Sequence, residues 1–132
     1  MIAIRFLLAH LIGDYLLQPH WMSQEKTQRW SVAATHGTIY GASHVLVTRS
    51  PWRLLIIGGT HAVIDRYRLA KHISWAKNQI GPARIREPWR NCKDTGYPTD
   101  VPWWLSVWLM IIVDNTIHLL INFLTIQKGK NT

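Results

Sequence analysis

The stretch His61–Asp65, HAVID, places a histidine and an aspartate four residues apart inside the apolar run LLIIGGTHAVIDRYRLAKH. The same spacing occurs in HLIGD, at His10 and Asp14, and it occurs reversed in DNTIH, where Asp114 precedes His118. Residues i and i+4 share one face of an α-helix, so each pair is predicted to point in one direction from its helix. Three such pairs in apolar segments indicate a helical protein with a polar interior.

Four apolar segments have the length and composition of membrane helices, at roughly 1–18, 31–48, 52–70 and 102–127. At 1.5 Å per residue, about 20 residues cross the ~30 Å hydrocarbon core of a bilayer. Tryptophans stand at the edges of several of these segments, as expected for amphipathic rings at a membrane interface. The predicted fold is all-α: a polytopic membrane protein that forms a four-helix up-and-down transmembrane bundle, with one domain over residues 1–132.

A soluble four-helix bundle is the competing interpretation, and the mean hydropathy of −0.02 suits it at first sight. Each helix of a soluble bundle would need a polar face rich in lysine and glutamate. The segments WWLSVWLMIIV, at 103–113, and WRLLIIGG, at 52–59, have no such face. The average hides long apolar runs that alternate with short basic ones, and we therefore favour the membrane interpretation.

The connection over residues 71–101 is basic, in a chain with 15 lysines and arginines against 7 acidic residues. We expect an amphipathic helix through KHISWAKNQI to Gly81, followed by an irregular loop that contains prolines. The opposite side, which includes Lys128 and Lys130, is less basic, so the positive-inside rule predicts that this connection is cytoplasmic and that both termini face outward. The expected location is the inner (cytoplasmic) membrane, multi-pass.

The basic connection also bears on the partners of the protein. Tryptophan interleaved with arginine in REPWRNCK, at 86–93, is compatible with nucleic-acid binding, but no nucleic-acid fold signature accompanies it. Attraction to anionic lipid head groups explains the same charges more simply. We therefore expect the lipid bilayer and its head groups as partners and no nucleic acid. Another membrane protein or a second copy of the chain is a further expected partner.

The reversed pair predicts where the polar side chains meet. An up-and-down bundle makes its first and third helices parallel and its fourth antiparallel to both. Reading the pair of the fourth helix backwards therefore puts the three aspartates in one layer and the three histidines in the layer one turn away. The second helix adds His36, at the head of a stripe that continues with Tyr40 and His44. We predict that these side chains face a common buried centre.

A metal ion would explain such a centre. A carboxylate at the middle of a membrane helix costs about 2.5–3.5 kcal/mol on insertion scales unless it is paired or coordinated, and three carboxylates in one layer repel one another. A divalent cation relieves both costs, and mixed imidazole and carboxylate ligands suit zinc, manganese or iron. The predicted metal ligands are His10, Asp14, His36, His61, Asp65, Asp114 and His118.

Three alternatives to the metal site stay open from the sequence. The first is a hydrogen-bonded polar core without metal, in which each aspartate orients its neighbouring histidine. The second pairs the aspartates with Arg66, Arg68 or Lys71. The third is a proton or ion pathway.

Several motifs of the chain point to one family when they are taken together. They are AHLIGDYLLQPHWM at 9–22, Lys26, THGTIYGASH at 35–44, HAVIDRYRLAKH at 61–72 and VDNTIHLL at 113–120. Over about residues 3–125 the chain resembles a family of small bacterial and phage integral-membrane proteins, catalogued as domain of unknown function 3307. Family members commonly carry Asp-Gln-x2-His in the last helix, where this chain has Asp114 and Asn115. The resemblance implies a multi-span membrane protein with a polar centre, and it supplies no activity.

Three functions compete. The first is an intramembrane metal-dependent hydrolase that acts on a lipid or a phosphate-bearing substrate, with catalytic carboxylates at Asp14, Asp65 and Asp114. The second is a non-catalytic phage or bacterial membrane protein that binds another membrane protein, in superinfection exclusion or assembly. The third is an oligomeric channel or transporter. The residues expected to bind the substrate of a hydrolase are Lys26, Arg66, Arg68 and Lys71.

Overall fold

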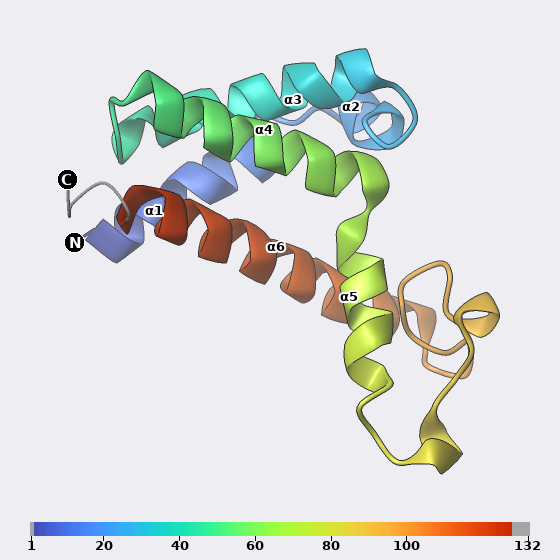
Figure 1. Cartoon of the computed structure of the whole chain (residues 1–132). Coiled ribbons are helices and arrows are strands. Elements are labelled where there is room, and N and C mark those ends of the chain that lie inside the picture. Colours follow the sequence, from blue (N-terminus) through green and yellow to red (C-terminus); the bar gives the residue numbers. More distant parts are fainter. Residues whose placement is uncertain (1, 128–132) are drawn as a thin grey trace. The chain divides into compact units, whose positions relative to one another are not determined.

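The computed structural model describes residues 2–127, which form helices, helical turns and loops (Figure 1). The predicted all-α class is confirmed. The chain divides into two compact units: one holds the residues up to Tyr67 together with those from His118 onward, and the other holds Arg68–Ile117. Lys128 and Lys130, which entered the comparison of charge on the two sides, lie outside the described residues.

The first helix of the first unit changes geometry before it ends. Helix α1 (Ile2–Leu11) runs into η1 (Ile12–Leu16), a π-helical turn in which the Leu17 amide donates to the Ile12 carbonyl at 2.9 Å. Gly13 of this turn packs on helix α3, where an added Cβ would come within 2.9 Å of Tyr40 Cδ2. The helix expected over residues 1–18 is therefore divided into an α-helical part and a wider π-helical turn.

The next helices of this unit lie side by side in Figure 1. A short helix, α2 (His20–Glu25), precedes α3 (Trp30–Ser43), which ends in the 3-10 turn η2 (His44–Leu46). Helix α4 (Pro51–Tyr67) returns along α3. The two helices approach so closely that a Cβ on Gly58 would collide with the Gly37 carbonyl. This contact brings the polar faces of α3 and α4 together.

The first unit is polar inside and apolar outside. Its fully buried side chains include five histidines, whereas Leu8, Leu16 and Leu55 are exposed. A small apolar cluster of Phe6, Ile57 and Ile126 also surrounds the buried ring of Tyr40. In a water-soluble protein leucine is usually buried and charged or polar groups are exposed. The distribution in this unit is the reverse, with the imidazoles at its centre.

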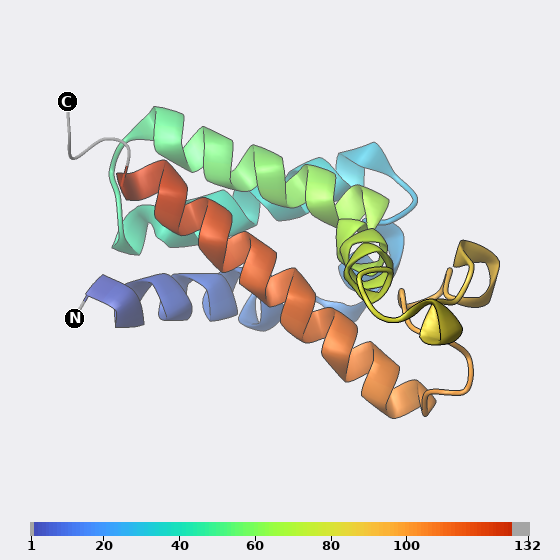
Figure 2. The same cartoon turned by 60° about the horizontal axis from the view of Figure 1, so that its bottom comes forward.

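Helix α6 (Trp103–Gln127) begins in the second unit and ends in the first, and Figure 2 shows it as one continuous helix. Its 25 residues extend about 38 Å at 1.5 Å per residue. Among residues 2–127 it is the one helix long and apolar enough to cross a membrane, and only 17% of its apolar window is buried. With 10 and 14 residues, α1 and α3 are shorter than the expected spans.

The second unit begins at a residue with unusual backbone geometry. Arg68 adopts a left-handed conformation with φ of 49° and separates α4 from α5 (Leu69–Asn78), which covers most of the amphipathic helix expected after residue 70. The following loop is irregular apart from two 3-10 turns, η3 (Ala83–Ile85) and η4 (Trp89–Asn91). The loop folds back on α5, because the Trp75 indole N–H donates to the Glu87 carbonyl at 3.0 Å.

Candidate metal centre

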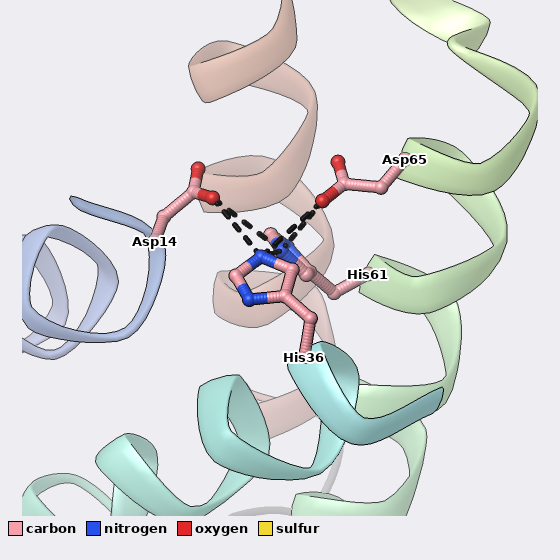
Figure 3. A group of neighbouring side chains, drawn as sticks. All are labelled: Asp14, His36, His61 and Asp65. Atoms are coloured by element: carbon pink, nitrogen blue, oxygen red, sulfur yellow. Dashed lines mark hydrogen bonds and ion pairs between the residues drawn. The ribbon is translucent and has the colours of Figure 1, made fainter. Parts of the chain in front are cut away.

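Four buried side chains of the first unit converge on one point, as Figure 3 shows. Asp14 comes from the π-helical turn, His36 from α3, and His61 and Asp65 from successive turns of α4. The two histidines are fully buried, and the two aspartates are 5% and 6% exposed. Each residue offers one ligand atom, and these atoms all lie within 4.8 Å of one another.

The separations between these atoms resemble the edges of a coordination tetrahedron. His36 Nε2 lies 3.3 Å from Asp14 Oδ1 and 3.4 Å from Asp65 Oδ2. His61 Nε2 lies 3.6 Å and 3.1 Å from the same two oxygens, and the two Nε2 atoms are 2.9 Å apart. Ligand atoms bound at 2.0–2.1 Å to a tetrahedral ion are about 3.3–3.4 Å apart. The four side chains could therefore hold a metal ion after small shifts.

A lysine stands beside the same atoms. Lys26, immediately after α2, places its Nζ 2.5 Å from Asp65 Oδ2 and 3.7 Å from Asp14 Oδ1. It also lies 3.3 Å from His36 Nε2, and its side chain is 13% exposed. Without a metal ion this ammonium group offsets one of the two negative charges and lies closer to Asp65 than to Asp14. The partner of the aspartates is thus Lys26, which the sequence had suggested as a substrate-binding residue.

His118, on α6, connects two of the four side chains. Its Nε2 lies 3.3 Å from Asp65 Oδ1, and its Nδ1 lies 3.2 Å from His61 Nδ1. If His61 offers its Nε2 lone pair to an ion, its Nδ1–H donates to His118 Nδ1, and the His118 Nε2–H then donates to Asp65. One set of tautomers satisfies the whole chain of bonds. His118, predicted as a ligand, therefore orients two candidate ligands by contacting His61 Nδ1 and Asp65 Oδ1, which are not the atoms that these residues offer to the ion.

A second polar layer lies against the first. Tyr40 stacks flat on His61, with ring centroids 3.6 Å apart and planes 10° apart. The Tyr40 hydroxyl accepts from Asn122 Nδ2 at 2.7 Å and lies 2.8 Å from His10 Nδ1. His44 Nδ1 lies 2.9 Å from the Tyr40 carbonyl, and its Nε2 lies 3.0 Å from Asn122 Nδ2. This network holds the Tyr40 ring, which in turn fixes the plane of His61.

The second layer contains one predicted ligand and one residue that sequence reasoning missed. His10, predicted as a ligand, faces Tyr40. Asn122 did not enter the predicted site, although it follows His118 by four residues on an apolar helix. The i, i+4 spacing that identified the histidine and aspartate pairs would have found it.

The other predicted residues lie as follows. Asp114 is half-buried on the part of α6 that belongs to the second unit. The Arg66 guanidinium donates to the Thr27 carbonyl and lies over the Trp30 ring at 5.8 Å. In the second unit, two basic side chains bind backbone carbonyls. Arg68 donates to Asp94 at 3.3 Å, and Lys71 donates to Lys93 at 3.0 Å.

Fold and site define a small helical protein with a buried histidine and aspartate group that could hold a metal ion. The chain belongs to the family described as "Protein of unknown function (DUF3307)", whose family model matches residues 2–84. The matched segment contains Lys26 and all four candidate ligands, and α6 lies beyond it. No curated protein and no solved structure matches the chain.

Proposed function

We propose that this protein is a membrane-embedded, metal-dependent hydrolase whose ion is held by Asp14, His36, His61 and Asp65. The observation that carries the proposal is the set of five separations of 2.9–3.6 Å between the candidate ligand atoms. Zinc suits the ligand types and the near-tetrahedral spacing best, and manganese and iron accept the same donors. The buried aspartates supply negative charge that favours a dication.

We further propose a multi-pass location in the inner membrane, and the apolar exterior of the first unit supports its burial in a bilayer. Exposed leucines such as Leu8 and Leu55 cover the outside of the first unit, and a bilayer would hide them from water. The start of α6 exposes Trp103, Trp104 and Trp108, a residue type that concentrates at membrane interfaces. We propose that α6 crosses the bilayer and that the shorter helices of the first unit lie within it, with the basic connection on the cytoplasmic side.

The side chains around the ion have distinct proposed roles. A bound divalent ion supplies a Lewis acid and favours hydroxide over water near neutral pH. Asp65 contacts Lys26 with one oxygen and His118 with the other. Asp14, on the π-helical turn, keeps its Oδ2 outside the set of candidate ligand atoms, and we therefore assign the general base to that oxygen. An ion that neutralises both carboxylates would release Lys26, whose partly exposed ammonium group is then suited to a phosphate of the substrate.

The test is elemental analysis of the full chain purified in detergent without chelator. We expect about one equivalent of a divalent transition metal. Asp65→Asn should lose the metal, and Asp100→Asn, an exposed aspartate of the other unit, should retain it. Hydrolysis of phospholipids and simple phosphate esters should then depend on the metal and stop with chelator. A protein without stoichiometric metal, whose melting also ignores added zinc or manganese, would refute the proposal.

A second function is favoured by one feature of the same site. Four protein ligands complete a tetrahedral shell, which is typical of structural zinc, whereas catalytic zinc keeps a position for water. On this reading the ion stabilises a non-catalytic membrane protein that presents its surface to another membrane protein. Stoichiometric metal, melting sensitive to chelator and no hydrolysis across the substrate panel would favour this second function over the hydrolase.

A further inference from the structure

The turn that follows α5 exposes two isoleucines. Ile80 is 85% exposed, more than any other large apolar side chain among residues 2–127, and Ile85 is 56% exposed. Figure 1 shows this turn as the yellow segment after α5. We name residues 80–86 the isoleucine turn. Exposed aliphatic side chains at such a position need a partner that removes them from water.

Hydrogen bonds hold the isoleucine turn in shape. The Arg86 Nε–H donates to the Gly81 carbonyl at 2.8 Å, and the Ile85 amide donates to the Pro82 carbonyl at 3.0 Å. Directly after the turn, the Glu87 carbonyl accepts from the indole of Trp75 on α5 at 3.0 Å. The isoleucines are therefore presented by a closed turn that is tied to a helix.

Positive charge surrounds these isoleucines. Arg84 and Arg86 lie within the turn, Lys77 lies one helical turn before it, and all three are exposed. Over residues 68–101 seven lysines and arginines oppose three acidic residues, a net charge of +4. The nearest acid, Glu87, is half-buried, and its carboxylate accepts from Asn91 Nδ2 at 2.7 Å. The surface therefore offers cations to a partner that carries negative charge.

We propose that the isoleucine turn is a membrane-interface anchor that binds anionic lipid head groups. Isoleucine inserts at the boundary between head groups and acyl chains, while arginine and lysine bind the phosphates above it. A second copy of the chain would bring the same positive charge and be repelled. Nucleic acid would need a stacking platform, and the nearby Trp89 already stacks on His72 with ring centroids 4.6 Å apart. This proposal does not depend on the metal centre.

The test places an environment-sensitive fluorophore at the turn in the full chain. Ile85→Cys, labelled with nitrobenzoxadiazole, is compared in phosphatidylcholine nanodiscs with and without phosphatidylglycerol. Phosphatidylglycerol should shift the emission to the blue and raise quenching by acyl-chain nitroxides about twofold or more. High salt should reduce the difference. Thr99→Cys, an exposed position of the same unit beside an acidic residue, serves as the control.

A charge variant separates the head-group contact from general burial. Arg84→Gln with Arg86→Gln, in the Ile85→Cys chain, should remove the response to phosphatidylglycerol. Arg49→Gln with Arg53→Gln, in the first unit, should leave it intact. Equal spectra at positions 85 and 99 in both lipids would overturn the anchor. An equal shift on adding an oligonucleotide or inorganic phosphate to phosphatidylcholine nanodiscs would also overturn it, because a soluble anion would then suffice.

Discussion

Lys26 and Asp65, which are separated by 38 residues of sequence, form an ion pair with Nζ 2.5 Å from Oδ2. The same oxygen is a candidate metal ligand. An ammonium group and a divalent ion repel each other and require the same carboxylate lone pairs. The buried centre therefore has two ways to offset the charge of its aspartates, a lysine or a metal ion, and Lys26 must move when a metal ion binds.

Replacing this lysine should strengthen metal binding and weaken the metal-free protein. Lys26→Met removes the competing charge, and we expect the affinity for zinc to rise about tenfold, or about 1.4 kcal/mol. The metal-free variant should lose about 3–5 kcal/mol of stability, because its buried carboxylates have lost their partner. Zinc titration against a competing chelator and thermal melts measure both effects. Lys77→Met is the matched control, and weaker zinc binding by Lys26→Met would contradict the competition.

Asp65→Asn should lower metal content and melting temperature together. The amide keeps the size of the side chain but replaces a charged ligand oxygen, and metal binding is part of the folding free energy when the unfolded chain has no assembled site. Elemental analysis measures the metal content, and thermal melts of both proteins with and without chelator measure how much of the stability depends on the metal. A polar network without metal would also lose stability on this change, because Lys26 loses its buried carboxylate partner, but the melts of both proteins would then ignore chelator.

His118→Ala should weaken metal binding without abolishing it. Its ring holds His61 and Asp65 in place, and the loss of such supporting bonds usually costs about 10–100-fold in affinity. The control is His20→Ala, an exposed histidine that begins α2. Complete loss of metal would instead make His118 a direct ligand, and an unchanged affinity would remove its supporting role.

Two adjacent glycines of α4 should respond oppositely to alanine. Gly58→Ala puts a methyl group into the Gly37 carbonyl, and we expect a loss of about 1–3 kcal/mol in the free energy of unfolding. At Gly59 an added Cβ would meet no described atom within 4 Å. Gly59→Ala should be neutral or add up to about 1 kcal/mol through helix propensity. Unfolding in mixed micelles compares the two, and equal effects would argue against the close α3–α4 contact.

Cys92 should resist alkylation in the folded protein. Its side chain is 2% exposed, and burial, followed by the charges of Glu87 and Asp100, raises the pKa of the thiol. A raised pKa leaves less thiolate at neutral pH, so the labelling rate should rise only in more alkaline solution or on unfolding. Labelling with a fluorescent maleimide, against Thr99→Cys as the exposed control, checks this. Equal rates for the two thiols would show that the loop does not protect Cys92.

Sequence periodicity was enough to predict the local geometry of the site. His61 and Asp65 lie one turn apart on α4 and both face the centre, because helical spacing depends on the backbone alone. The same rule placed His36 on the buried face of α3. It did not predict the π-helical turn that carries Asp14, because the spacing argument assumes the regular α-helical period.

The sequence by itself determined the helical class, the apolar surface and the histidine and aspartate pairs, because each of these follows from residue type and short-range spacing. Tertiary structure alone decided that Lys26 is the cation beside Asp65, and that His118 lies within hydrogen-bond distance of His61 Nδ1. The left-handed turn at Arg68, which carries no glycine signal, was likewise decided there. The physical reason is that these contacts join segments far apart in the chain. Their partners are selected by the packing of whole helices, which local spacing does not encode.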